Sequence, residues 1–248
     1  MNSYNKIASA SSLAILLSGI FGTANAGLFD DPQNLKVLPE DITPKQLSAT
    51  MRGFAINTGS RCSTCHVGKV ESDLSTYDFS LDEKEKKQKA RAMIRMVDDI
   101  NRFLAENLDK PAGELVTVDC ETCHRGQARP EMLQDVLAKA YRSDGLDNAI
   151  SEYRTLREKY YGSHTFDFSE RALMSLGERM AEEDEITASL GFLSLNLEFY
   201  PGSARTLVTQ GQVQALSGDV AGARASYNRA LEIEPENKWT RRLLDALE

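Results

Sequence analysis

Cysteine and histidine recur in one compact pattern, C-x-x-C-H. Residues 62–66 read CSTCH and residues 120–124 read CETCH, and these two segments use all four cysteines of the chain. The pattern is typical of c-type haem attachment, in which two thiols form thioethers with one porphyrin and the histidine supplies a nitrogen ligand to the iron. We therefore expect two covalently bound haem c groups. The expected attachment residues are Cys62, Cys65, Cys120 and Cys123, and the expected proximal iron ligands are His66 and His124.

Two other kinds of site use paired cysteines. A zinc site needs four ligands, and C-x-x-C-H alone leaves the remaining ones unspecified. A thioredoxin-like redox site expects a strand followed by a helix, and it has no second copy of the motif. Two copies that together use every cysteine favour haem over both.

The sixth ligand of each iron must come from elsewhere in the chain. The chain has three histidines, so only His164 is left, well beyond the second motif, and histidine cannot complete both sites. Methionine is the alternative ligand, and it raises the reduction potential of a haem. Met51 precedes Cys62, in a segment (48–56) that reads as a short helix followed by a turn at 57–60. Such a turn would fold Met51 back over the ring.

Two further methionines lie in a second predicted helix, QKARAMIRMVDDINRFLAENL. Its apolar residues follow a helical period, and Met93 and Met96 belong to that apolar stripe. Methionine on such a stripe also serves simply to pack a core. Periodicity alone therefore leaves Met51, Met93 and Met96 open as iron ligands.

Residues 34–130 resemble the cytochrome subunit of purple-bacterial photosynthetic reaction centres. The resemblance rests on the stretches NLKVLP, MRGFAINTGSRCSTCHVG, ARAMIRMVDDIN and VTVDCETCHRG. In that family each haem packs against a helix that carries its methionine ligand upstream of C-x-x-C-H. The resemblance implies Met51 as the distal ligand of the first haem and Met93 as that of the second, with Met96 packing beside the ring or taking the place of Met93. The family subunit typically carries four haems, whereas this chain has motifs for two.

The N-terminus has the features of a secretory signal peptide over residues 1–26. Lys6 supplies a weak positive charge, residues 7–20 are apolar, and the small residues of ANA at 24–26 fit cleavage after Ala26. The alternative is a retained membrane anchor, but the apolar run is shorter than the roughly 20 residues that a spanning helix needs. We expect cleavage and a periplasmic protein, which could associate with the membrane through a partner.

Residues 27–130 are expected to form a dihaem cytochrome c domain. Prolines, the last of them Pro44, predict irregular structure over 27–50. The charged run DEKEKKQKAR at 82–91 opens the second predicted helix. It is expected to be a solvated face, the alternative being a basic patch that docks an acidic partner. Residues 109–113 should break that helix before the second motif.

Residues 131–248 contain no cysteine, and they repeat with a period of about 34 residues, which is the tetratricopeptide period. Stacked helix pairs would bury one continuous core and leave a concave surface for a partner, the alternative being a purely structural array. A degenerate unit around Ala149 and Tyr153 should precede the clear copies, and residues 237–247 should cap them. The pairs one period apart are Gly177 and Gly211, Ala181 and Ala215, and Pro201 and Pro235.

Charge is unevenly divided between the two halves. Residues 27–130 carry 15 basic and 17 acidic residues, a net charge of −2, while residues 131–248 carry 13 and 20, a net charge of −7. The overall charge of −8 argues against nucleic acid as a partner. The acidic second half favours a basic protein partner instead.

These features predict an all-α protein in which a dihaem c-type cytochrome domain precedes a tetratricopeptide-like repeat domain. The predicted function is periplasmic transfer of single electrons, similar to that of the reaction-centre cytochrome subunit, with the repeats docking a redox protein or a membrane electron-transfer complex. Iron held on both faces has no open position, so neither enzyme activity nor a small-molecule substrate is expected. One alternative is a dihaem peroxidase-type enzyme, for which His164 is a poorly placed distal residue. The other is a repeat scaffold with structural or sensory haems.

The intact mass of the mature protein should exceed that of the polypeptide by two haem groups. Thioether bonds survive denaturation, so the excess should persist in mass spectra recorded under denaturing conditions. A mass with one added haem, or with none, would contradict the prediction that each motif attaches one haem.

Overall fold

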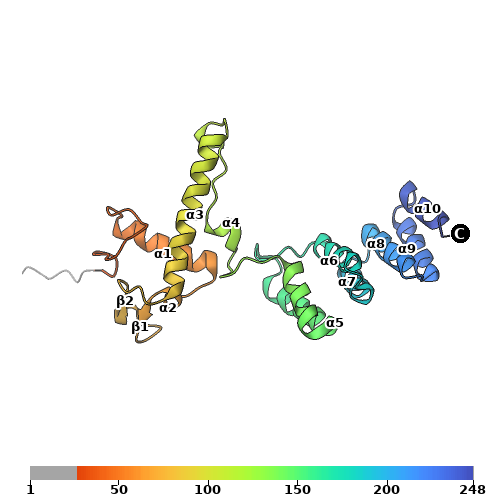
Figure 1. Cartoon of the computed structure of the whole chain (residues 1–248), viewed down its shortest axis with the longest axis horizontal. Helices are drawn as coiled ribbons and strands as arrows, with labels where there is room; N and C mark the ends of the chain where they lie inside the picture. The colour runs from red at the N-terminus through yellow and green to blue at the C-terminus, as the bar shows by residue number, and fades with distance from the viewer. Residues whose placement is uncertain (1–26, 248) are drawn as a thin grey trace, which may run out of the picture.

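A computed structural model describes residues 27–247, and the expected signal peptide at residues 1–26 lies outside the described residues. The described chain is all-α, apart from one two-stranded ladder of two residues per strand, in which β1 (Val67–Gly68) pairs antiparallel with β2 (Tyr77–Asp78). The elements around the two motifs lie at one end of an elongated molecule, and the later helices extend away from them to the C-terminus (Figure 1). We call residues 27–130 the motif domain and residues 131–247 the repeat domain.

The motif domain is built from two longer and two very short α-helices. Its elements are α1 (Pro44–Thr58), α2 (Cys62–Cys65), a 3₁₀ turn at Leu74–Thr76, α3 (Glu85–Asn107), a 3₁₀ turn at Ala112–Glu114 and α4 (Cys120–His124). Each C-x-x-C-H motif thus forms a single helical turn, and a longer helix precedes each of them.

Helix α1 begins earlier than the sequence predicts. Pro44 is the first helical residue, and Thr43 caps the helix by accepting a hydrogen bond from the backbone of Gln46. Proline suits this position because the first helical residues have no intrahelical acceptor for their N–H groups. The prediction of irregular structure was therefore wrong at Pro44. The predicted turn after the helix is present, with Gly59 in the left-handed conformation (φ 60°).

Helix α3 projects away from the rest of the motif domain, and it ends at Asn107, just before the predicted break (Figure 1). The chain then returns along the helix. The Asn101 side chain donates to the carbonyl of Val118 (2.7 Å) and accepts from the N–H of the same residue (2.8 Å). This two-way bond mimics a strand pair. It fixes the start of the second motif against the middle of α3.

The repeat domain consists of antiparallel helix pairs. Its helices are α5 (Leu133–Tyr160), α6 (Glu170–Glu182), α7 (Ile186–Phe199), α8 (Ala204–Leu216), α9 (Val220–Ile233) and α10 (Lys238–Asp245). Helix α5 is itself two helices, because Gly145 has a non-helical backbone (φ 84°, ψ −178°). The bend makes α5 the predicted degenerate first unit, in which Ala149 and Tyr153 are buried. Helix α10 is the predicted cap.

The two clear repeat units share one internal contact. A Cβ atom added to Gly177 would lie 2.7 Å from Cγ of Leu193, and one added to Gly211 would lie 2.5 Å from Cε1 of Tyr227. Leu193 and Tyr227 are themselves one period apart. The glycine of each first helix therefore makes room for a large side chain from the second helix. This is the physical reason for the glycine period.

Apolar burial is concentrated in the repeat domain. Aromatic and leucine side chains from α5, α6 and α7 form its main cluster, and a smaller cluster joins α8 to α9. Of the side chains described between residues 27 and 130, Leu47 is the one hydrophobic side chain that is buried. The motif domain must therefore be held together by interactions other than apolar burial. Within residues 27–247, no helix is both long enough and apolar enough to span a bilayer.

Replacing Gly211 with alanine should destabilise the repeat domain. Overpacking costs about 1–3 kcal/mol, and the better helix propensity of alanine offsets at most about 1 kcal/mol of it. We expect the thermal midpoint to fall by roughly 2–4 °C, as followed by circular dichroism. Gly177→Ala should behave alike, whereas Gly202→Ala is the control, because a Cβ atom there meets nothing within 4 Å. Equal midpoints for all three variants would contradict this packing.

Candidate haem-binding site

The first motif is a one-turn helix that presents both cysteines near its surface. In α2, the N–H of His66 donates to the carbonyl of Cys62 (2.9 Å). Cys62 is exposed and Cys65 is half-buried. Residues three apart on a helix share one face. Two thiols on one face of one turn suit attachment to one edge of a flat group.

His66 follows this turn and lies against Phe79. Their ring centroids are 4.9 Å apart at an interplanar angle of 65°. Burial lowers the pKa of His66 to about 4, and the nearby cations Lys87, Lys84 and Arg91 act in the same direction. The imidazole is therefore neutral at pH 7. A neutral imidazole has the free lone pair that a metal ligand needs.

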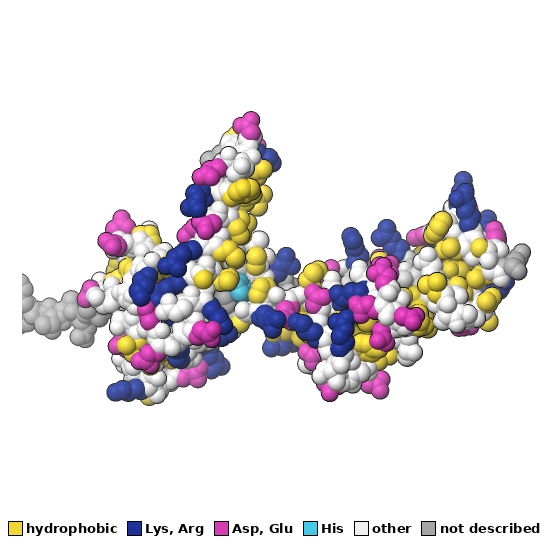
Figure 2. Space-filling model, in the orientation of Figure 1, with side chains coloured by type: hydrophobic (Ala, Val, Ile, Leu, Met, Phe, Trp, Pro, Cys, Tyr) yellow, Lys and Arg dark blue, Asp and Glu magenta, His cyan; other side chains and the backbone are white. Residues whose placement is uncertain are grey.

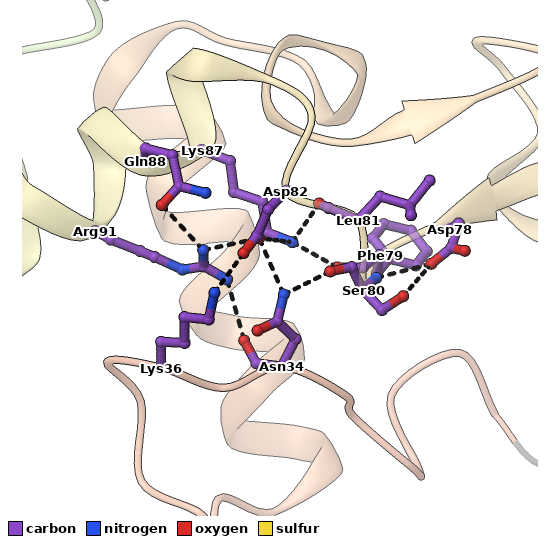
Figure 3. A network of polar contacts seen from close by, with 10 residues as sticks. All are labelled: Asn34, Lys36, Asp78, Phe79, Ser80, Leu81, Asp82, Lys87, Gln88 and Arg91. Atoms are coloured by element: carbon purple, nitrogen blue, oxygen red, sulfur yellow. Dashed lines mark hydrogen bonds and ion pairs between the residues drawn. The ribbon is translucent and has the colours of Figure 1, made fainter.

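A cluster of polar contacts holds the loop that carries Phe79. The ammonium group of Lys87 donates to the carbonyls of Phe79 (2.9 Å) and Leu81 (2.7 Å). Arg91, one turn later on α3, pairs with the carboxylate of Asp82 (2.8 Å) and donates to the carbonyl of Asn34 (3.1 Å). Figure 3 shows these contacts, which we call the Asp82 cluster. They join α3, the loop and the N-terminal segment.

Asp82 is the acceptor on which this cluster converges. Its carboxylate lies 2.6 Å from the ammonium of Lys36 and 3.1 Å from that of Lys87. Hydrogen bonds from Lys36, Asn34, Lys87 and Arg91 hold the pKa of Asp82 far below its usual range, although desolvation opposes them. Lys87 and Arg91 are only 8% and 6% exposed. The prediction of a solvated face over 82–91 was therefore wrong for these two residues.

The second motif forms the slightly longer helix α4. Asp119 caps it by accepting from the N–H of Thr122 (2.9 Å). Nδ1 of His124 lies 2.7 Å from the carbonyl oxygen of Gln127. A carbonyl can only accept, so Nδ1 must carry the proton and donate. The other ring nitrogen, Nε2, then keeps its lone pair, as in metal-ligating histidines whose second nitrogen is held by a carbonyl.

The two motifs are joined through the end of α1. The N–H of Gly126, two residues after His124, donates to the carbonyl of Asn57 (2.8 Å). A Cβ atom added to Gly59 would lie 2.1 Å from the carbonyl oxygen of Gly126. Only glycine allows the two chain segments to approach this closely. The helix that leads into the first motif therefore also supports the second.

The candidate methionine ligands lie on the two longer helices. Met51 is half-buried on α1, and Met93 and Met96 on α3 are each 43% exposed. Because the exposures are equal, exposure alone does not separate Met93 from Met96. Phe103 on the same helix is 63% exposed, and Figure 2 shows hydrophobic side chains running along α3. A contiguous apolar face on a projecting helix marks a binding surface.

Two of the four motif cysteines have a raised pKa. Burial raises the pKa of Cys65, and burial together with Asp119 raises the pKa of Cys120. Redox-active cysteines usually have a lowered pKa, because they act as thiolates. Cys65 and Cys120 therefore lack the lowered pKa of a redox-active cysteine.

The described residues fit haem. Paired thiols on single helical turns, one neutral and one oriented imidazole, and an apolar face on α3 are the features that a haem c group requires. A porphyrin would also supply apolar surface to a domain in which Leu47 is the one described hydrophobic side chain that is buried. Cys62, Cys65 and His66 would hold one group, and Cys120, Cys123 and His124 the other.

The loop between α5 and α6 lies unexpectedly close to the second motif. The hydroxyl of Thr165 donates to the carbonyl of Arg125 (3.0 Å), the residue that follows His124. The exposed His164 is therefore near the second motif, although sequence reasoning placed it among the repeats. Sequence reasoning also missed the supporting residues, and bonds to backbone carbonyls leave no sequence signal. The missed residues are Phe79, Asp82, Lys87, Arg91, Asn101, Gln127 and Thr165.

A family model described as "Photosynthetic reaction centre cytochrome C subunit" matches residues 27–174. The chain belongs to this family. Membership implies covalently bound haem c and electron transfer with redox or membrane-complex partners. The match to the reaction-centre cytochrome family continues past Pro130 into α6, so it includes the loop of Thr165.

No curated protein matches the chain. Among solved structures, the first TPR of Spaghetti (RPAP3) bound to the HSP90 peptide SRMEEVD is similar at 15% identity. That match has a TM-score of 0.33 and covers 46% of this chain and 86% of the other. The repeat assignment therefore rests on the helix pairs and their shared glycine contact.

Replacing Gly59 with alanine should weaken the motif domain. The left-handed conformation costs a non-glycine residue about 1–2 kcal/mol, and the new Cβ atom would also displace the Gly126 carbonyl. We expect the thermal midpoint of the haem-loaded protein to fall by at least about 4 °C, as followed by visible absorbance. Gly53→Ala on the same helix is the matched control, because nothing lies within 4 Å of its Cβ position. If both variants have the same thermal midpoint, the close approach of the two segments would be refuted.

Proposed function

We propose that this protein is a periplasmic dihaem c-type cytochrome that carries single electrons between redox partners. The observation that carries the proposal is the pair of C-x-x-C-H turns, each with a histidine prepared to bind iron. His124 is oriented by the Gln127 carbonyl (2.7 Å), and His66 is kept neutral by burial. When bound, haem c supplies a one-electron couple whose potential the protein tunes.

The roles of the individual residues follow from their positions. Cys62, Cys65, Cys120 and Cys123 anchor the two groups covalently. Met51 on α1 and Met93 on α3 are proposed as distal ligands, since each helix precedes the motif that it serves. With one histidine and one methionine bound to it, neither iron would have an open position. The proposal is therefore an electron carrier and not an enzyme.

The repeat domain is proposed as the docking module. Its net charge of −7, counted over 131–248, favours a basic surface on the partner, which would be a redox protein or a membrane electron-transfer complex. The signal-like segment at 1–26 supports export to the periplasm. A purely structural array is the alternative that a binding experiment would reveal.

A dihaem peroxidase-type enzyme is the second candidate. The bond from Thr165 to Arg125 favours it, because this bond brings the loop of His164 close to the second motif. Such an enzyme needs an iron with a displaceable ligand. Binding of carbon monoxide to the unmodified protein would support it, whereas two six-coordinate, low-spin irons support the carrier.

Methionine variants should identify the distal ligands. Met51→Ala and Met93→Ala should each lower the potential of one haem or open it to carbon monoxide, because each removes one axial ligand. Visible spectra of the reduced protein with and without carbon monoxide provide the measurement. Met96→Ala is the control for Met93→Ala, since both side chains are 43% exposed on α3. An effect from Met96→Ala but not from Met93→Ala would place the ligand one helical turn away.

A further inference from the structure

The two motifs differ in the charge that surrounds them. At the first motif, Lys84, Lys87 and Arg91 follow one another at the start of α3, and one carboxylate, that of Asp82, pairs with both Lys87 and Arg91. Lys84 donates to the carbonyl of Ser63, between the two cysteines, and makes no ion pair within residues 27–247. Glu71 accepts from the Ser63 hydroxyl (2.8 Å), but it also pairs with Arg61 (3.3 Å). The cations around the first motif therefore still outnumber the carboxylates.

The second motif lacks such an excess of cations. Asp119 caps α4, Glu121 lies inside the motif, and Arg125 follows His124. All three side chains are exposed, so their charges are screened by solvent. No buried cation corresponds to Lys87 or Arg91 among the side chains described around α4.

The two histidines also differ in their second ring nitrogen. Nδ1 of His124 donates to the Gln127 carbonyl at 2.7 Å. Nδ1 of His66 is buried and has no hydrogen-bond partner among the described residues. A hydrogen bond from Nδ1 to a carbonyl increases the basicity of the imidazole as a ligand. A more basic ligand stabilises the more positive, oxidised iron and so lowers its reduction potential.

Both differences act in the same direction. Positive charge near an iron favours the reduced form, which carries one positive charge fewer, and this raises the potential. The N-terminus of α3, which lies beside the first motif where Lys84 contacts Ser63, adds its partial positive charge to the effect. We infer that the haem at Cys62, Cys65 and His66 has the higher reduction potential and is reduced first, with Lys84 as a residue that sets the difference.

This inference rests on the proposed function, because it requires both haems to be present. Mass spectrometry of the same sample separates the two claims. A protein with fewer than two haems fails the proposed function, whereas a dihaem protein with equal potentials fails only the inference.

The test is a potentiometric titration of the full-length dihaem protein, followed by visible absorbance. Two one-electron steps are expected. Lys84→Gln should lower the higher potential and leave the lower one unchanged. The expected change in the reduction equilibrium constant is roughly three- to tenfold, where tenfold corresponds to ~59 mV for one electron.

Two matched variants separate charge from structure. Lys84→Arg keeps the charge and should keep the higher potential. Lys89→Gln removes an exposed cation from the same helix, one that pairs with Glu85 at 2.9 Å, and should move neither step. A double variant, Cys62→Ser with Cys65→Ser, should retain one haem and titrate at the lower potential.

The outcomes are distinct. A single step, or a Lys84→Gln effect that is absent or falls on the lower potential, would overturn the inference. So would a double-serine variant that titrates at the higher potential. If that variant does not fold, the titrations of Lys84→Gln and Lys84→Arg still test the inference.

Discussion

The Asp82 cluster is the interaction on which the motif domain depends. A domain of this size ordinarily holds its elements together by burying apolar side chains, but here Leu47 is the one described hydrophobic side chain that is buried before residue 131. The Asp82 cluster replaces that core on the side of the first motif. Through Arg91 and Asn34 it ties α3 to the N-terminal segment, and through Lys87 it fixes the loop that presses Phe79 onto His66. Structural support and the electrostatic setting of the first motif thus come from the same side chains.

The repeat domain follows a different physical principle. Its helices bury apolar side chains in one cluster over α5, α6 and α7 and in a second that joins α8 to α9, and its polar contacts are mostly caps and surface pairs. The bond between Thr165 and Arg125 connects it to the second motif. The repeat array is therefore attached on the side of the second motif, which we infer to have the lower potential.

Sequence reasoning succeeded where residue type and spacing carry the physics. The cytochrome family could be predicted from the two C-x-x-C-H motifs, because haem attachment requires those residues at that spacing. The repeat units could be predicted because glycine must face Leu193 or Tyr227 once in every period. The turn at 57–60 and the capping helix at 237–247 followed from turn and repeat rules.

Sequence reasoning failed where a backbone atom is the partner. The burial of Lys87 and Arg91 depends on carbonyls of Phe79, Leu81 and Asn34 that only the folded chain assembles. The charged run at 82–91 predicts a solvent-exposed face as long as these backbone acceptors are unknown. Backbone carbonyls are also the partners that orient His124, through Gln127, and that hold Asn101 against Val118. The choice between Met93 and Met96 stays open for another reason, since both lie on one exposed stripe of α3.

The shared glycine contact constrains how the length of this protein can change. Gly177 with Leu193 and Gly211 with Tyr227 form the same contact one period apart. An insertion or deletion of one whole period keeps each such contact in register. A single residue inserted within a helix instead rotates the part that follows by about 100°, and so moves its buried side chains off the core face. Natural or engineered relatives should therefore differ in array length by whole helix pairs, and each added pair would move the C-terminal end farther from the two motifs without altering them.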